Sequence, residues 1–257
     1  MKYIKGFYMA LGMFCGIPLP FHIWDEKLTS IMVASLPLIG LIIGSLWWVT
    51  GLILTAPALP IMMVSAILTV VPFLIAGFIH LDGFMDTSDA LLSRRPLEDR
   101  LRILKDPRVG AFAVVMLVVL FLLQFSAMYS VVEGGRYLAL LIIICVISRC
   151  FSALSIFLLR HSSISHYGSL LSQNTRKGHK FFVLLVGLVA VTLSYLYAGI
   201  IGLSVSVAVV LGFTLAMRTV YKTFEGISGD LLGYSMVIGE LFGLIALALL
   251  QGLWVNI

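Results

Sequence analysis

Residues 111–131, AFAVVMLVVLFLLQFSAMYSV, form a long stretch without a charged side chain. At 1.5 Å of rise per helical residue, about 20 residues cross the ~30 Å hydrocarbon core of a bilayer. No water is available at that depth to satisfy backbone N–H and C=O groups, so such a stretch has to be helical even where it is rich in β-branched residues. The sequence therefore predicts a transmembrane helix here.

Further runs of similar hydropathy lie on both sides of this one, at residues 30–53, 58–79, 137–159, 181–198, 199–217 and 237–255. The chain is 61% hydrophobic and 11% charged, with a mean hydropathy of +1.11, which excludes an ordinary water-soluble domain. No linker or internal repeat divides it. We predict an all-α, polytopic membrane helix bundle of about seven transmembrane helices, forming a single domain over residues 1–257.

An N-terminal hydrophobic segment, residues 7–20, precedes these runs and ends in Ile-Pro-Leu-Pro. It is short for a crossing. Three alternatives are open: the segment lies in the membrane interface, enters the membrane and returns, or completes an additional crossing.

Positive charge is distributed unevenly between the two sets of loops. With seven crossings, residues 21–29, 80–110, 160–180 and 218–236 share one side and hold most of the Lys and Arg side chains, whereas the opposite loops offer little beyond Arg136. This excess predicts that the shared side is cytoplasmic, in a multi-pass protein of the inner cell membrane. The net charge of +5 is concentrated where anionic lipid, a nucleotide or a phosphorylated substrate could meet it. No nucleic-acid partner is expected, and the sequence is compatible with a homo-oligomer.

Three aspartates interrupt the hydrophobic pattern in residues 80–89, HLDGFMDTSD. The offsets of four and three residues between Asp82, Asp86 and Asp89 place their carboxylates on one face of a helix. Converging carboxylates repel one another, and Mg²⁺, which prefers oxygen ligands and bridges to phosphates, is their natural partner. The alternative is that Asp82 caps a helix and the other two pair with nearby arginines. The position directly after an apolar run favours a metal site.

A second polar segment, residues 105–110 (KDPRVG), leads back to the membrane. Lys105 and Arg108 can donate hydrogen bonds to phosphate oxygens, and Asp106 could ligate the ion or orient one of these cations. The alternative is a basic anchor beside the membrane with a proline turn. The nearby aspartates favour the first interpretation.

A third polar segment, residues 225–233 (EGISGDLLG), contains glycines that permit close approach of the backbone. Asp230 could complete a metal site from a second helix, and Ser228 and Gly229 are candidate substrate contacts. Taken alone, a glycine-rich turn with an aspartate N-cap explains this segment better.

Other polar side chains have weaker patterns. Arg149 and Glu240 lie within predicted crossings, so each needs a partner or a water-lined pocket, and they could satisfy each other. His80 is a candidate base or phosphate ligand, or an interfacial hydrogen-bonding residue. Loop residues that could contact a polar substrate are His161, His166 and Tyr167. Three cysteines, without metal-site or disulfide spacing, are assigned to packing: Cys15, Cys145 and Cys150.

Together these patterns predict a membrane-embedded, Mg²⁺-dependent site for a phosphorylated substrate, with phosphoryl transfer as the reaction class. Several segments, in this order, also carry a family resemblance: residues 17–20 (IPLP), 36–40 (LPLIG), 80–89, 105–110, 147–149 (ISR), 228–233 and 239–240 (GE). On these motifs, which span nearly the whole chain, the sequence resembles the cobalamin synthase family, whose members are adenosylcobinamide-GDP ribazoletransferases.

The resemblance implies that adenosylcobinamide-GDP and α-ribazole, or α-ribazole 5′-phosphate, are joined with release of GMP and with Mg²⁺ as cofactor. Asp82, Asp86 and Asp89 would hold the ion against the diphosphate, with Asp230 as a candidate further ligand. The charge that develops would be neutralised by Lys105, Arg108 and Arg149.

Some positions depart from the family pattern. Carboxylates are absent where Arg102 and Val237 stand, and other residues replace the usual ones at Ala90, Glu225 and Cys15-Gly16. These departures put in doubt any fourth metal ligand at positions 102 and 237, for which Glu98 and Glu225 are candidate replacements.

Two other classes of function compete with this one. A CDP-alcohol-type membrane phosphotransferase would show an Asp-Gly-x-x-Ala-Arg opening, and Met85-Asp86 stands where Ala-Arg would be. A transporter would carry its carboxylates within the crossings, near the membrane midplane. Here most of them cluster at one face, which favours a catalytic surface.

Overall fold

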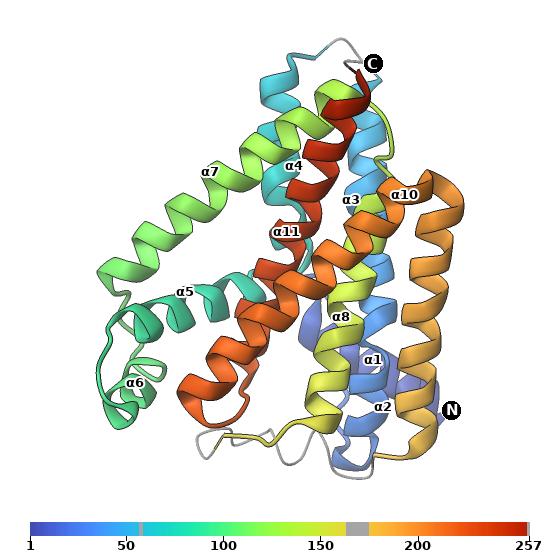
Figure 1. The fold of residues 1–257 in the computed structure, drawn as a ribbon. Helices are drawn as coiled ribbons and strands as arrows, with labels where there is room; N and C mark the ends of the chain where they lie inside the picture. Colours follow the sequence, from blue (N-terminus) through green and yellow to red (C-terminus); the bar gives the residue numbers. More distant parts are fainter. Residues whose placement is uncertain (57–58, 163–174, 256–257) are drawn as a thin grey trace.

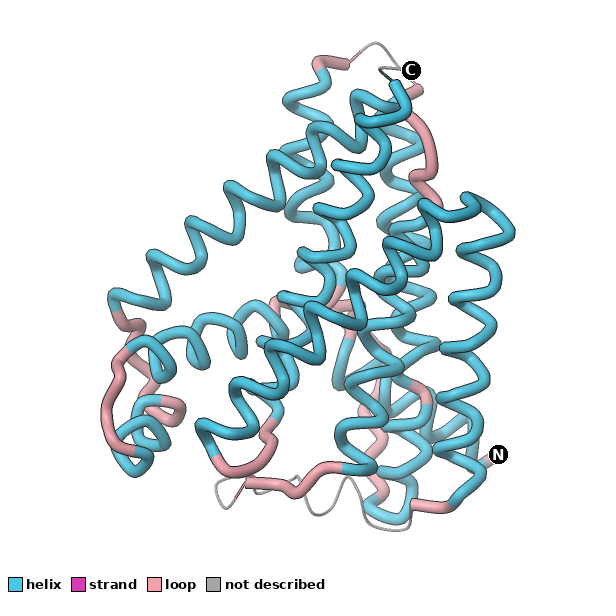
Figure 2. Tube along the Cα trace, viewed as in Figure 1, coloured by secondary structure: helices cyan, strands magenta, loops and turns pink. Residues whose placement is uncertain are grey.

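The computed structural model describes residues 1–56, 59–162 and 175–255. Within these ranges the chain forms helices and no strand, and its extended pairing is one isolated bridge between His161 and Ile227. The predicted all-α, polytopic bundle is confirmed (Figure 1). Figure 2 shows most of the loops toward the two ends of the bundle and a few shorter ones near its middle.

The helices follow one another along the chain as α1 (Lys2–Phe14), the 3₁₀ turn η1 (Glu26–Leu28), α2 (Thr29–Ala34), α3 (Leu36–Thr55), α4 (Ile61–Ile75), α5 (Ile79–Leu92), α6 (Leu97–Ile103), α7 (Ala111–Gly134), α8 (Leu140–Leu158), α10 (Lys177–Phe224) and α11 (Gly229–Val255). Five of them, α3, α7, α8, α10 and α11, are long and apolar enough to cross a membrane. The α4–α5 pair is a sixth span if its two bent halves are counted as one.

Helix α10 reverses direction at Gly199, whose backbone (φ 57°, ψ −133°) is open to glycine but strained for other residues. Its two arms meet at this bend and diverge from it across the bundle (Figure 1), and the Ser194 hydroxyl donates a hydrogen bond to the Gly202 carbonyl across the bend. The predicted boundary between the runs 181–198 and 199–217 coincides with this reversal.

The predicted run 58–79 differs from the structure. Helix α4 covers only Ile61–Ile75, about 22 Å of helix, which is too short to cross the hydrocarbon core alone. The chain then turns by 94° into α5. Gly77 and Phe78 make this turn with left-handed φ angles of 68° and 61°.

The length of helix α1 excludes one of the three alternatives for the N-terminal segment, an additional complete crossing of the membrane. Its 13 residues extend about 20 Å, too short for a complete crossing. It packs against α2 and α3 near the end of the bundle that carries the α6 region and the 160–162 and 225–228 segments (Figure 1).

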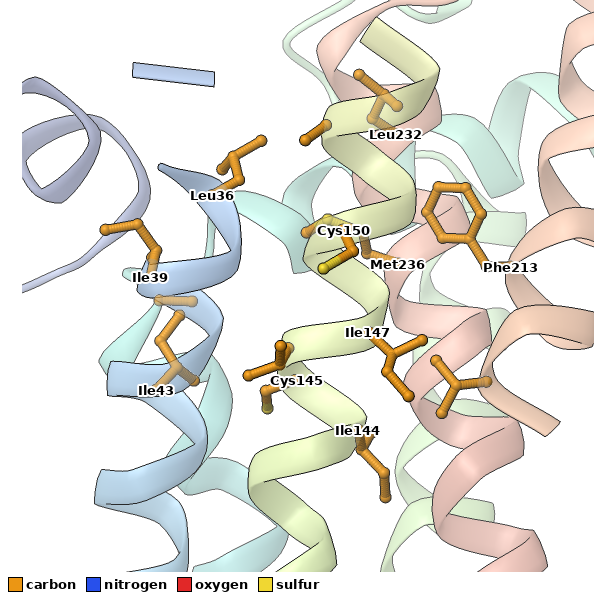
Figure 3. Packing of buried hydrophobic residues seen from close by; sticks show 14 of the residues in the cluster. Leu36, Ile39, Ile43, Ile144, Cys145, Ile147, Cys150, Phe213, Leu232 and Met236 are labelled. Atoms are coloured by element: carbon orange, nitrogen blue, oxygen red, sulfur yellow. The ribbon is translucent and has the colours of Figure 1, made fainter. Parts of the chain in front are cut away.

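The centre of the bundle is helix α8, which packs against α3 on one side and against α10 and α11 on another (Figure 3). Close packing with α3 depends on Gly40 and Gly44, because a Cβ added at either would meet the backbone of α8 at 2.5–2.6 Å. Small residues four apart allow helices to approach closely in membranes. Cys145 and Cys150 lie in this core and Cys15 is also buried, with all three thiols free, so the assignment to packing is confirmed.

Candidate active site

Helix α5 carries the three sequence-predicted aspartates. Leu81, Phe84 and Ser88 are buried on one of its faces. Asp82 is exposed and Asp86 and Asp89 are half-buried on the opposite face, as their spacing predicted. The turn after α4 therefore presents a row of carboxylates to one side of α5.

Helix α11 begins beside this row. Ser228 caps it, because the Ser228 hydroxyl accepts a hydrogen bond from the backbone N–H of Leu231 at 3.4 Å. Asp230 lies in the first turn, where the helix dipole favours negative charge. The side chain that caps the helix is thus a serine, and the Asp230 carboxylate is left available.

Two glycines let α5 and α11 cross in close contact. A Cβ added at Gly83 would lie 2.8 Å from the Asp230 Cα, and one added at Gly233 would lie 3.2 Å from the His80 carbonyl oxygen. The backbones therefore touch where the carboxylates are, which brings Asp230 close to the aspartates of α5.

The four carboxylates interact electrostatically. Asp82, Asp230 and Asp89 all act on Asp86, and Asp82 acts on Asp230. Among the described residues, none of the four side chains has an ion pair or hydrogen bond. The described side chains also include no group of three or more His, Cys, Asp or Glu already arranged around a metal position. The donor set is nevertheless the all-oxygen, anionic kind that suits Mg²⁺.

The 105–110 segment connects α6 to α7 next to the end of α5. The Asp89 carboxylate lies directly against the Gly110 Cα, where a Cβ would overlap with it. The Arg108 guanidinium donates two hydrogen bonds to Asp106, of 2.9 Å from Nε and 2.6 Å from Nη2. These bonds lower the pKa of Asp106 to about 2, so the pair stays ionised at any physiological pH. Asp106 thus orients Arg108, one of the two roles proposed for it, while Lys105 is exposed.

His80 and Asp230 lie at the same small cavity of about 130 Å³, which is lined otherwise by Gly229 and mostly apolar side chains. It has room for a few water molecules but not for a nucleotide. His80 is therefore placed beside an aspartate, and its proposed role as a base or phosphate ligand stays a prediction.

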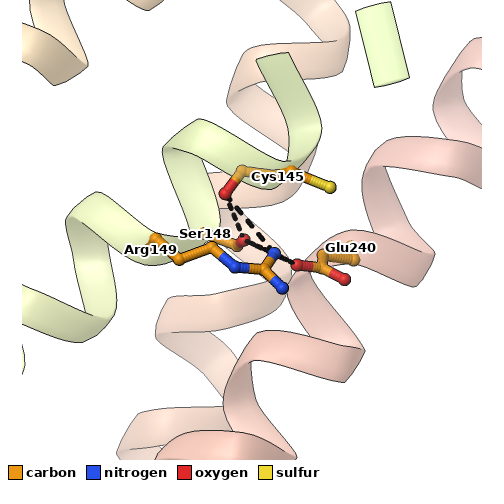
Figure 4. Close-up of polar contacts among 4 residues, drawn as sticks. All are labelled: Cys145, Ser148, Arg149 and Glu240. Atoms are coloured by element: carbon orange, nitrogen blue, oxygen red, sulfur yellow. Dashed lines mark hydrogen bonds and ion pairs between the residues drawn. The ribbon is translucent and has the colours of Figure 1, made fainter. Parts of the chain in front are cut away.

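Arg149 is buried in α8 and forms an ion pair with Glu240 of α11 (Figure 4). The Ser148 hydroxyl lies 2.7 Å from Glu240 Oε1, and Arg149 Nη1 donates to this hydroxyl at 2.9 Å. The prediction that the two charged residues satisfy each other is confirmed. The further role of Arg149 toward substrate stays a prediction.

Two backbone hydrogen bonds fix the start of α11 to the end of α8, from Ser162 N–H to the Ile227 carbonyl and from Ile227 N–H to the Arg160 carbonyl. Gly226 lies against Ser162 with no space for a Cβ. His161 forms the isolated bridge to Ile227 here. His166 and Tyr167 lie outside the described residues.

A family model described as cobalamin-5-phosphate synthase matches residues 6–248. The chain belongs to this family. A Clostridium botulinum protein named adenosylcobinamide-GDP ribazoletransferase is 37% identical over 95% of this chain and 97% of its own length. Proteins of the same name from Clostridium perfringens (36% identical over 96% of this chain and 99% of the relative) and Brevibacillus brevis (31% identical over 98% and 100%) are also similar. No solved structure matches the chain.

The departures from the cobalamin synthase pattern are of two kinds: missing carboxylates, at Arg102 and Val237, and other replacements, at Glu225, Ala90 and Cys15-Gly16. Arg102 pairs with Asp99 at 3.6 Å on the surface, and Val237 is buried in an apolar cluster with Phe84, so neither position can supply a ligand. Glu225 ends α10 with a left-handed φ of 53°, a conformation that favours glycine. Ala90 is fully buried, and Gly16 lies against Gly77 at the α4–α5 turn.

Sequence reasoning singled out the carboxylates but missed the residues that bring them together. Gly83 makes the close contact with α11, and Tyr234 of α11 stacks on Phe84 of α5 with ring centroids 5.5 Å apart. A glycine inside a helix is unfavourable by about 1 kcal/mol relative to alanine, so its presence between two aspartates was the available signal of a close approach.

We predict that Gly83→Ala separates α5 from α11, because the new methyl group overlaps with the Asp230 backbone. The overlap should destabilise the folded protein by about 1–3 kcal/mol, measured as a lower unfolding temperature in detergent, and should reduce activity. Gly187→Ala is the control, since its Cβ would meet Cys150 only at ordinary contact distances of 3.6–3.7 Å. Equal stability and activity for both variants would contradict the proposed crossing.

We also predict that Glu240→Ala destabilises the protein by about 3–5 kcal/mol, because Arg149 is left as a buried, unpaired charge. The double variant Arg149→Met, Glu240→Leu should recover much of this loss. Asp99→Ala, which removes one partner of the exposed pair with Arg102, should change the stability by about 1 kcal/mol or less. The measurement is unfolding in detergent, and a Glu240→Ala variant as stable as Asp99→Ala would show that the buried pair is unimportant.

Proposed function

We propose that this protein is an adenosylcobinamide-GDP ribazoletransferase of the membrane, which joins adenosylcobinamide-GDP to α-ribazole or α-ribazole 5′-phosphate in cobalamin synthesis. Family membership and the names of the relatives support the activity. The observation that carries the assignment within the structure is the meeting of α5 and α11, where Asp82, Asp89 and Asp230 act electrostatically on Asp86. None of the four carboxylates has a cationic partner in the described part of the chain.

The reaction transfers a phosphoryl group. A ribose hydroxyl attacks the cobinamide-linked phosphorus of the diphosphate, a new P–O bond forms, and the bond to the bridging oxygen breaks. GMP leaves with that oxygen, and the hydroxyl proton is lost. Such a reaction depends on positioning and on neutralising the charge of the diphosphate.

We infer that Mg²⁺ binds at this site, held by Asp82 and Asp86 of α5, with Asp89 and Asp230 as further ligands. When bound, the ion would offset the negative charge of the diphosphate oxygens and of the leaving GMP. The crowded, unpaired carboxylates fit this ion because its charge removes their mutual repulsion.

The cations of the 105–110 segment complete the site in this proposal. Asp106 fixes the Arg108 guanidinium by two hydrogen bonds, which limits the conformational freedom that Arg108 would otherwise lose on binding a phosphate. Asp89 lies against Gly110, so this segment is held next to the carboxylate row. Lys105 and Arg108 then donate to phosphate oxygens, and Ser228 and Gly229 contact the substrate from the start of α11.

The orientation of the protein follows from its charge. The Lys and Arg side chains are concentrated in the segments at the α6 end of the bundle, which is the pattern of a cytoplasmic face. We therefore place the active face in the cytoplasm and the bundle in the inner cell membrane, where soluble nucleotide substrates reach the carboxylates directly.

The activity is tested by incubating the purified protein in lipid with adenosylcobinamide-GDP, α-ribazole and Mg²⁺ and measuring GMP. We expect GMP release together with adenosylcobalamin, and absence of GMP from the wild type would refute the transferase. Chelation by EDTA should stop the release and added Mg²⁺ should restore it. If chelated protein keeps its rate, the transferase assignment stands and the metal proposal fails.

We predict that Asp82→Asn and Asp86→Asn each slow GMP release by roughly 100-fold or more, the scale for losing a group that stabilises transition-state charge. Asp230→Asn should raise the Mg²⁺ concentration needed for half-maximal rate. Glu133→Gln is the matched control, because it neutralises an exposed carboxylate at the far end of α7. Wild-type rates in both α5 variants would exclude the carboxylate row from the reaction.

A further inference from the structure

Two hollows adjoin each other on a side of the bundle that the active site does not use, between α1, α2, the start of α3 and the first turns of α10. The outer hollow, about 550 Å³, is lined by Lys2, Lys27, Arg176 and His179 and by a few smaller or apolar residues. None of the four aspartates of the candidate active site lines it.

The inner hollow, also about 550 Å³, is mainly apolar. Phe7 of α1, Leu38 of α3 and Phe182 of α10 line it. Tyr3, Ile31, Arg176 and His179 line both hollows, so the two form one continuous groove. The cations of the outer hollow come from the start of α1, from η1 and from the residue before α10, whereas Phe7, Leu38 and Phe182 of the inner hollow lie further along α1, α3 and α10.

The charges of the outer hollow are all of one sign. Within the described ranges, Lys2, Lys27 and Arg176 have no carboxylate partner. The nearest acidic residues in sequence, Asp25 and Glu26, do not line the groove, and the Asp25 carboxylate accepts a hydrogen bond from the Lys27 backbone N–H. Lys2 and Arg176 come from different helices, yet both lie close enough to His179 to act on it electrostatically.

Such an arrangement suits a ligand with a negative head and an apolar tail. Cations that gather without carboxylates attract an anion, and each Lys or Arg near a membrane surface strengthens the binding of an anionic headgroup. A small soluble anion would not use the apolar hollow beside these cations, because it has no apolar surface to bury there. A hydrocarbon chain would fill it and remove its apolar surface from contact with mobile lipid.

We propose that this groove binds one anionic phospholipid, with its phosphate among Lys2, Lys27 and Arg176 and an acyl chain against Phe7, Leu38 and Phe182. The site is separate from the reaction centre. It joins α1, which does not cross the membrane, to α3 and α10 through a shared ligand.

The test uses the full-length protein in detergent, incubated with equal amounts of dioleoyl phosphatidylglycerol and dioleoyl phosphatidylcholine, and native mass spectrometry to count the lipids retained. We expect the wild type to retain one phosphatidylglycerol in preference. The double variant Lys27→Gln, Arg176→Gln should lose this preference by roughly 10-fold or more. The matched control, Arg95→Gln, Lys222→Gln, removes two exposed cations outside the groove and should behave as the wild type.

Two further measurements separate a lipid from a free anion. Leu38→Trp fills the apolar hollow and should reduce retention of the dioleoyl lipid while all the cations are still present. A large excess of inorganic phosphate should not displace the lipid from the wild type. Displacement by phosphate would identify a soluble-anion site and overturn the proposal, as would equal retention by the wild type and the Lys27, Arg176 double variant.

Discussion

The close contact between Gly83 of α5 and the Asp230 backbone of α11 determines the geometry of the candidate active site. Carboxylates on a single helix lie in a row and offer ligands from one direction only. A metal ion that bridges to a diphosphate needs oxygen atoms around more of its surface. Because Gly83 and Gly233 have no side chains at the points of closest contact, Asp230 can approach the row from a second helix. The stacking of Tyr234 on Phe84 holds the two helices together.

The turn at Gly77 and Phe78 sets the direction of α5 and so brings it into contact with α11. The 94° turn directs α5 across the bundle toward α7 and α11. The start of α11 is fixed independently by the Ser228 cap and by the hydrogen bonds of Ile227 to the 160–162 segment. The two helices that carry the carboxylates therefore hold their positions through different parts of the chain.

The hydropathy pattern predicted the long transmembrane helices, because these depend on the lipid surroundings. It did not predict the turns and helix crossings, because these depend on contacts between residues far apart in the sequence. The predicted run 111–131 agrees closely with α7, Ala111–Gly134, since a single segment that crosses a bilayer has no alternative to a helix. The run 58–79 did not stay intact, because the turn at residues 77–78 depends on backbone angles that a hydropathy pattern does not contain. The start of α11 at Gly229 was also missed, eight residues before the predicted run, since Asp230 and Ser235 lower the local hydropathy of its first turns. The spacing of the aspartates predicted the carboxylate face of α5, whereas the contact between α5 and α11 became visible only in the three-dimensional structure.

The pair between Arg149 and Glu240 also has a consequence for biosynthesis. The two residues are 91 positions apart, and ribosomes add about 5–20 residues per second. Arg149 is therefore synthesised roughly 5–18 seconds before its partner exists. An arginine at the centre of an inserting helix opposes insertion by about 2.5–3.5 kcal/mol, which the surrounding apolar residues of α8 must overcome alone. The ion pair with Glu240 can form only after α11 has been synthesised, so Arg149 is without this partner while the helices between them are made.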